Sequence, residues 1–150
     1  MFHLTDDTES DDIEVRRIVR SLREMRVIRL GESPLTVAAP AAFAAVPVPD
    51  VADGPSAAYA DEAEQRYFDL YLHSYDGSYD AFAAQCAAVY GDRAGGIVSN
   101  SPIVKYFTVN GEGMTVLIDL GGGNAAELRF RAVEGDMDWA SEIVRSLRVG

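Results

Sequence analysis

The chain has 150 residues, of which 48% are hydrophobic and 25% are charged, values typical of one globular domain that can bury a core. Its formal net charge of −11 at pH 7 disfavours non-specific binding to nucleic acid or to an anionic membrane, because both present negative phosphates. We therefore expect neither nucleic acid nor a membrane among its partners.

The cysteine content and the lack of long apolar runs exclude further classes of site and of protein. Cys86 is the only cysteine, which excludes an internal disulfide and a cysteine-based metal cluster, and its alanine-rich surroundings predict a buried, inert thiol. No run approaches about 18 apolar residues, the length that a membrane-spanning helix needs. Without a basic and apolar leader, the chain as given is expected in the cytoplasm; a chain excised from a longer protein would be secreted or surface-attached.

Residues 1–25 predict an N-terminal strand–helix segment that packs on the rest of the chain. Phe2–Leu4 is short and apolar. From Ile13 to Met25, apolar residues recur at three- and four-residue spacing, which is typical of an amphipathic helix with arginines on its other face. These arginines form either a solvated face or a docking surface for an acidic partner. Residues 26–150 are expected to form the main domain, and the two parts a single compact unit.

A hairpin and an irregular stretch come next. Arg26–Leu30 and Leu35–Ala38 favour strands, and Gly31–Pro34 between them has the composition of a turn. Pro40–Ser56 contains four prolines, which remove hydrogen-bond donors and exclude a regular helix or central strand. It is expected to be an ordered loop, a mobile flap or a linker.

The middle of the chain predicts a short strand, a long strand and a helix. After Ala57–Ala60, Gln65–Tyr75 alternates strictly, with Phe68, Leu70 and Leu72 on one side. Asp76–Ser78 then ends the strand and caps a helix. The apolar face of that helix is formed by Tyr79, Phe82, Ala83, Cys86, Val89 and Tyr90.

The C-terminal third predicts an antiparallel meander and a last helix. The expected strands are Ile103–Val109, Met114–Leu120 and Ala126–Val133, joined by glycine-rich turns. The helix follows at Asp138–Leu147, with Ile143 and Leu147 meeting Leu128 and Phe130 in the core. Its residues Ile143–Arg148 repeat the six residues Ile18–Arg23, so we interpret residues 2–23 as a second strand–helix unit of the same design.

The sequence predicts no catalytic residue, cofactor site or metal site. His3 and His73 have no metal-ligating partner at a recognised interval, and Asp69 lies about 13 Å from His73 along an extended strand. Gly121–Gly123 precedes a strand, whereas a phosphate-binding loop precedes a helix. The serines lack the context of a nucleophile elbow, so the chain is predicted not to be an enzyme.

One side of the sheet stands out by its residue types. Alternation gives the sheet an apolar face and a mixed face, and the mixed face holds Tyr67, Asp69, Tyr71, His73, Thr115, Asp119, Glu127, Arg129 and Arg131. It is either a solvated face with cross-strand ion pairs or a surface that binds a partner, since tyrosine and arginine dominate interfaces. The residues predicted to bind a partner, named here the candidate binding face, are Tyr67, Asp69, Tyr71, His73, Arg129 and Arg131.

The order of elements, closed by the phrase Ile143-Val144-Arg145-Ser146-Leu147, resembles the PsbP-like α/β/α sandwich family over about Val27–Arg148. That resemblance implies a non-catalytic accessory or partner-binding role and provides no catalytic motif. A second resemblance, to acidic bacterial secretion chaperones, implies a homodimer that holds an unfolded client. The long proline-rich loop and the extra strand fit the chaperones less well.

The sequence thus predicts an α+β fold, an α/β/α sandwich around a twisted, mainly antiparallel sheet of about five to seven strands with three helices. The first hypothesis for function is a non-enzymatic binding or accessory domain acting through a protein partner. One alternative is a small-molecule binder or enzyme with a pocket under residues 40–56, lined by Tyr67, Tyr71 or His73. Others are the dimeric chaperone and a purely structural repeat.

Overall fold

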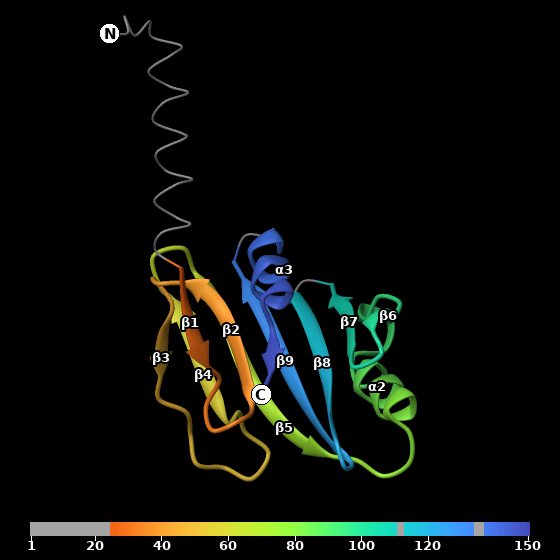
Figure 1. Cartoon of the computed structure of the whole chain (residues 1–150). Helices are drawn as coiled ribbons and strands as arrows, with labels where there is room; N and C mark the ends of the chain where they lie inside the picture. Colours follow the sequence, from red (N-terminus) through yellow and green to blue (C-terminus); the bar gives the residue numbers. More distant parts are fainter. Residues whose placement is uncertain (1–24, 111–112, 134–136) are drawn as a thin grey trace, which may run out of the picture.

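The computed structural model describes residues 25–110, 113–133 and 137–150, which form an α+β fold with two antiparallel sheets (Figure 1). The larger sheet has seven strands in the order β3-β4-β5-β9-β8-β7-β6, and the smaller has three in the order β1-β2-β10. The large-sheet strands are β3 (Ala44–Val46), β4 (Ala57–Asp61), β5 (Arg66–Ser74), β6 (Val98–Ser101), β7 (Val104–Val109), β8 (Gly113–Gly121) and β9 (Asn124–Ala132). The predicted hairpin and meander are both confirmed.

The small sheet is built on the predicted hairpin of β1 (Met25–Arg29) and β2 (Leu35–Pro40), to which β10 (Arg148–Val149) adds a short third strand. Gly31 has φ +57°, which favours glycine in this turn. Met25 was expected to end a helix and belongs to β1 instead. The rest of the predicted N-terminal strand and helix lies outside the described residues.

The main core lies between the apolar face of the large sheet and a second layer made of the small sheet and helix α3 (Asp138–Arg145). Both layers contribute fully buried side chains, because successive strand residues point to opposite faces. Four aromatic rings join them: Phe43, Phe68, Phe130 and Trp139 lie with neighbouring ring centroids 5.2 to 5.8 Å apart. Leu128, Phe130 and Ile143 meet in this core as predicted.

A second, smaller core forms on the opposite face of the same sheet. Helix α2 (Tyr79–Ala88) buries Tyr79, Phe82 and Ala83 there, against Phe107, Leu117 and Ala125 of the strands. Ser78 is the N-cap, and its hydroxyl accepts from the Ala81 amide at 3.0 Å. The short 3-10 turn η1 (Gly91–Arg93) follows the helix, and its Arg93 carbonyl accepts from the amide of Asn110, the residue after β7, at 2.8 Å.

Several expectations need correction. The described residues contain two α-helices, since the third predicted helix falls on residues 13–25. The large sheet has seven strands, within the predicted range, but the separate three-stranded sheet was not predicted. Helix α2 was expected on the apolar face or the flank of the sheet but packs on the mixed face. Val89 is 80% exposed because the helix has ended at Ala88, and Leu72 is 46% exposed because it lies near the end of β5.

Candidate functional site

The six residues of the candidate binding face lie together on β5 and β9, two central strands of the large sheet. The antiparallel register pairs Tyr67 with Arg131, Asp69 with Arg129, and His73 with Ala125. Odd-numbered residues of both strands point away from the main core, since their even-numbered neighbours form it. The structure therefore brings together the residues that the sequence singled out.

Two arginines of this face stack on two tyrosines of the neighbouring strand. The guanidinium carbon of Arg129 lies 3.9 Å from the ring centroid of Tyr71, and that of Arg131 lies 5.7 Å from the ring centroid of Tyr67. A cation over an aromatic ring is attracted by the negative face of the ring. These contacts hold long side chains in fixed positions, with Arg131 55% exposed and Arg129 39% exposed.

Glu127 of β9 links the two strands that carry this face. It is only 3% exposed, and its carboxylate accepts from His73 Nε2 at 2.7 Å and from Arg129 Nε at 2.8 Å. A buried carboxylate needs such partners, because an unpaired charge away from water is costly. Arg131 reaches Asp69 at 3.3 Å, in a more exposed contact. Alternation placed Glu127 on the mixed face, but nothing in the sequence marked it as the centre of these contacts.

The environment shifts the pKa of three of these groups. Burial acts to raise the pKa of Glu127, but the hydrogen bonds and charges of His73 and Arg129 outweigh burial and hold that pKa below its usual value. For Asp69, burial dominates over the charges of Arg131 and Arg129, so its pKa is raised. Burial acts to lower the pKa of Arg129, yet its contacts with Glu127 raise it. Glu127 and Arg129 therefore form a firmly ionised pair.

Helix α2 covers one end of the mixed face. The rings of His73 and Phe82 lie 5.4 Å apart, and Tyr75 stacks on Phe82 at 5.1 Å. His73 is thus the member of the candidate binding face that lies against this helix. Burial raises the pKa of Cys86, on the same helix, to about 11, which disfavours the reactive thiolate.

The charged side chains of the candidate binding face are paired with one another or with Glu127. Among the described residues, no group of three or more His, Cys, Asp and Glu side chains is placed to hold a metal ion. Asp69 and His73 do not contact each other: Asp69 is paired with Arg131, and His73 with Glu127. In the same part of the chain, no helix is long and apolar enough to cross a membrane.

Two hollows lie away from the predicted pocket under residues 40–56. One, of about 430 Å³, lies between the turn at Glu32–Pro34 and the ends of β5 and β9, and His73 is among its lining residues. The other, of about 170 Å³, lies beside α3. Neither is lined by residues 40–56 or by Tyr67 and Tyr71, which stack with arginines instead.

Comparison with known proteins supports the fold. No protein-family model and no curated protein matches the chain. The chain is similar to the solution structure of cyanobacterial PsbP (CyanoP) from Synechocystis sp. PCC 6803, with a TM-score of 0.60 over 85% of this chain and 93% of that one. The two are 11% identical in sequence, so the likeness concerns the fold alone. The predicted resemblance to the PsbP-like fold is confirmed.

Proposed function

We propose that the chain is a non-enzymatic binding domain that acts through a protein partner, and that the partner docks on the candidate binding face. The observation that carries the proposal is the pair of stacked arginines, Arg129 on Tyr71 and Arg131 on Tyr67. Tyrosine and arginine are the side chains that contribute most to protein interfaces. Here they stand together on adjacent strands and stay partly exposed.

Preorganisation gives a second argument for this face. The contacts of Arg129 and Arg131 with acidic and aromatic neighbours fix two long side chains before any partner arrives. Ordering a flexible side chain on binding costs roughly 0.5–1.5 kcal/mol, a cost that such contacts reduce. The PsbP-like fold is consistent with the accessory, partner-binding role that the sequence resemblance implies.

Photo-crosslinking tests the proposal, because it captures a bound partner whatever its identity. Tyr71 is replaced by p-benzoylphenylalanine, an aromatic photo-crosslinker, in cells of the source organism, and covalent adducts are identified by mass spectrometry. Tyr106 is the matched control, because it lies on the opposite face of the same sheet. We expect one dominant adduct from position 71 and none of the same mass from position 106.

The crosslinked mass also separates the alternatives. An adduct of about twice the chain mass of 16.2 kDa would show that the partner is a second copy, as the dimeric chaperone alternative predicts. Adducts of equal yield from positions 71 and 106, or from position 106 alone, would contradict the assignment of the face.

A further inference from the structure

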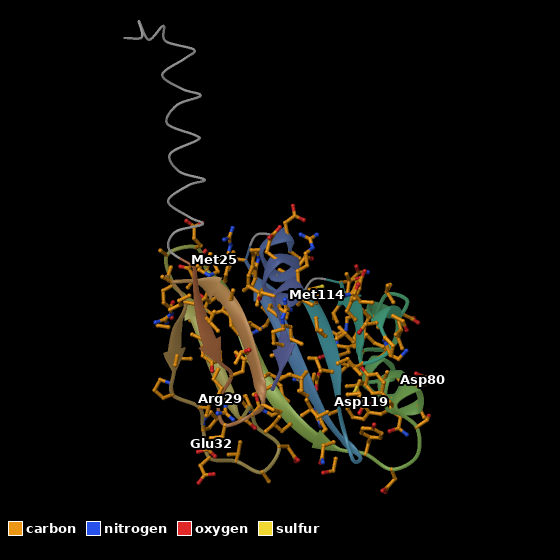
Figure 2. The ribbon with its side chains drawn as sticks, in the orientation of Figure 1. Met25, Arg29, Glu32, Asp80, Met114 and Asp119 are labelled. Atoms are coloured by element: carbon orange, nitrogen blue, oxygen red, sulfur yellow. The ribbon has the colours of Figure 1, made fainter. Side chains whose placement is uncertain are left out.

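The seven-stranded sheet is wider than the layer that covers its apolar face, and a cleft remains where the cover ends. Helix α3 lies on one side of this cleft, and β6 and β7 lie on the other. Met114 of β8 and Val144 of α3 form an apolar floor of the cleft, with the fully buried Val116 beneath them. Figure 2 labels Met114 close to α3. The cleft has a volume of about 170 Å³.

Polar side chains join this apolar floor. Asn100 of β6 and Tyr106 of β7 approach from one side, and Ser141 and Arg145 of α3 from the other. Small-molecule sites typically combine an apolar lining with a few convergent polar groups that fix the orientation of the ligand. The volume of about 170 Å³ leaves room for a single ring, and the cleft is open to solvent on one side.

Among the described residues, Arg145 is the only charged one that lines this cleft. Its guanidinium contacts Glu142 at 2.9 Å, and the two side chains are 71% and 66% exposed. An exposed pair of this kind contributes little to stability, so Arg145 can exchange Glu142 for another carboxylate at small cost. Arginine is also suited to carboxylates in particular, because its planar donors match both oxygens.

We propose that this cleft binds a small organic acid, with a ring-sized apolar group between Met114 and Val144 and its carboxylate against Arg145. The site lies on the opposite side of the sheet from the candidate binding face, so it goes beyond the proposed protein–protein function and does not depend on it. The positive charge of Arg145 determines the class of ligand: the cleft binds an acid more tightly than the neutral amide or the amine of the same shape.

The test uses the methionines as reporters. The chain has 4 of them, and among the described ones Met114 lines the cleft whereas Met25 and Met137 lie elsewhere. Protein labelled with ¹³C at the methionine methyl groups is titrated with phenylacetate and, separately, with phenylacetamide, and the methyl NMR signals are followed. We expect a saturable shift of the Met114 signal, with the amide binding about threefold more weakly, the size of an exposed ion pair.

Two variants locate the carboxylate. Arg145→Ala is expected to weaken phenylacetate binding about threefold and to remove the preference for phenylacetate over phenylacetamide. Arg148→Ala removes an exposed arginine that does not line the cleft and should leave binding unchanged. Absence of a Met114 shift, equal affinity for acid and amide, or an unchanged affinity in Arg145→Ala would each overturn the proposal.

Discussion

At the scale of single residues, Glu127 determines how the candidate binding face is held together. Its buried carboxylate accepts hydrogen bonds from His73 on β5 and from Arg129 on β9, the strand of Glu127 itself. Arg129 in turn stacks on Tyr71. Removing one partner of a buried charged contact lowers the unfolding free energy by more than an exposed ion pair contributes to it. The reason is that the remaining charged group stays buried without a partner. Glu127 is therefore expected to matter for both stability and the shape of the face.

The lowered pKa of Glu127 predicts a specific dependence of stability on pH. Its usual pKa is 4.5, and the folded state lowers it, so the ionised form favours folding. The contribution is complete above the unfolded pKa and is lost as pH falls through the folded one. Glu127→Gln is expected to cost about 1–3 kcal/mol at neutral pH and progressively less in acid.

Urea unfolding from about pH 7 to about pH 3 checks this dependence, since the other carboxyl groups titrate in both proteins and cancel in the difference. A difference in unfolding free energy that stays constant over this range would show that the Glu127 charge is not stabilised by folding.

Ser146 gives a physical reason for the phrase Ile143–Leu147. Its hydroxyl accepts from the Ala38 amide at 2.7 Å and donates to the carbonyls of Ala38 or Ile143. On this edge of β2, strand β10 pairs only with Leu35 and Thr36, so Ser146 satisfies a strand amide that β10 does not reach. The serine thereby fastens the end of α3 to the small sheet.

Ser146→Ala leaves the Ala38 amide without this acceptor and is expected to lower the unfolding free energy by about 1–2 kcal/mol. Ser99→Ala is a suitable control, because the Ser99 hydroxyl lies in an exposed contact with Lys105 and exposed substitutions usually change stability by less than about 0.5 kcal/mol. Chemical denaturation of both variants measures the effect, and equal losses would show that the Ser146 contacts do not fasten the helix.

At the scale of elements, the glycines at the two ends of β8 differ in what they tolerate. Gly113 has φ +138°, and a side chain there would overlap the carbonyl of Phe130 on β9. Gly121 has φ +84° in the next turn, but open space surrounds it. Both positions favour glycine for its backbone freedom, and only Gly113 also needs it for close approach of the strands.

Gly121→Ala is therefore expected to cost about 1–2 kcal/mol, the strain of a residue with positive φ. Gly113→Ala should cost about 2 kcal/mol more, because overpacking against β9 adds to that strain. Thermal or urea unfolding compares the two variants directly. A smaller loss for Gly113→Ala than for Gly121→Ala would contradict the close packing of β8 on β9.

The sequence predicted elements well where one periodic pattern decided the structure. The alternation in β5, the cap at Ser78 and the glycine turn at Gly121–Asn124 each follow from local chemistry, and the structure has them. The side of the sheet that α2 covers depends on the chain's path after Tyr75, which no local pattern encodes. Periodicity alone also extended the helical face to Val89 and Tyr90, beyond the end of the helix at Ala88, although Tyr90 still packs against the small core.

At the scale of the whole molecule, the sequence could not predict that the strands divide between two sheets. The hairpin of β1 and β2 has the same local signals as a hairpin within one sheet, and its position over the main core is set by long-range packing. The two-residue strand β10 is defined only by its pairing with Leu35 and Thr36. The candidate binding face was predictable because β5 and β9 alternate strictly, but its stacking and its buried centre were not.

The two faces of the large sheet differ in what they carry. One face supports the main core, and the other presents Tyr67, Tyr71, Arg129 and Arg131 beside the small core under α2. This arrangement predicts that Tyr67 and Tyr71 can be changed without loss of the fold, because they lie outside both cores.

The most direct test of the central claim is calorimetric titration of the crosslinked partner, purified without the link, into the wild-type chain and into Tyr67→Ala/Tyr71→Ala. We predict that the double variant keeps its fold and loses at least about 2 kcal/mol of binding free energy, the threshold for interface hot spots. Tyr106→Ala on the other face should bind as the wild type does. An unchanged affinity in the folded double variant would contradict the account.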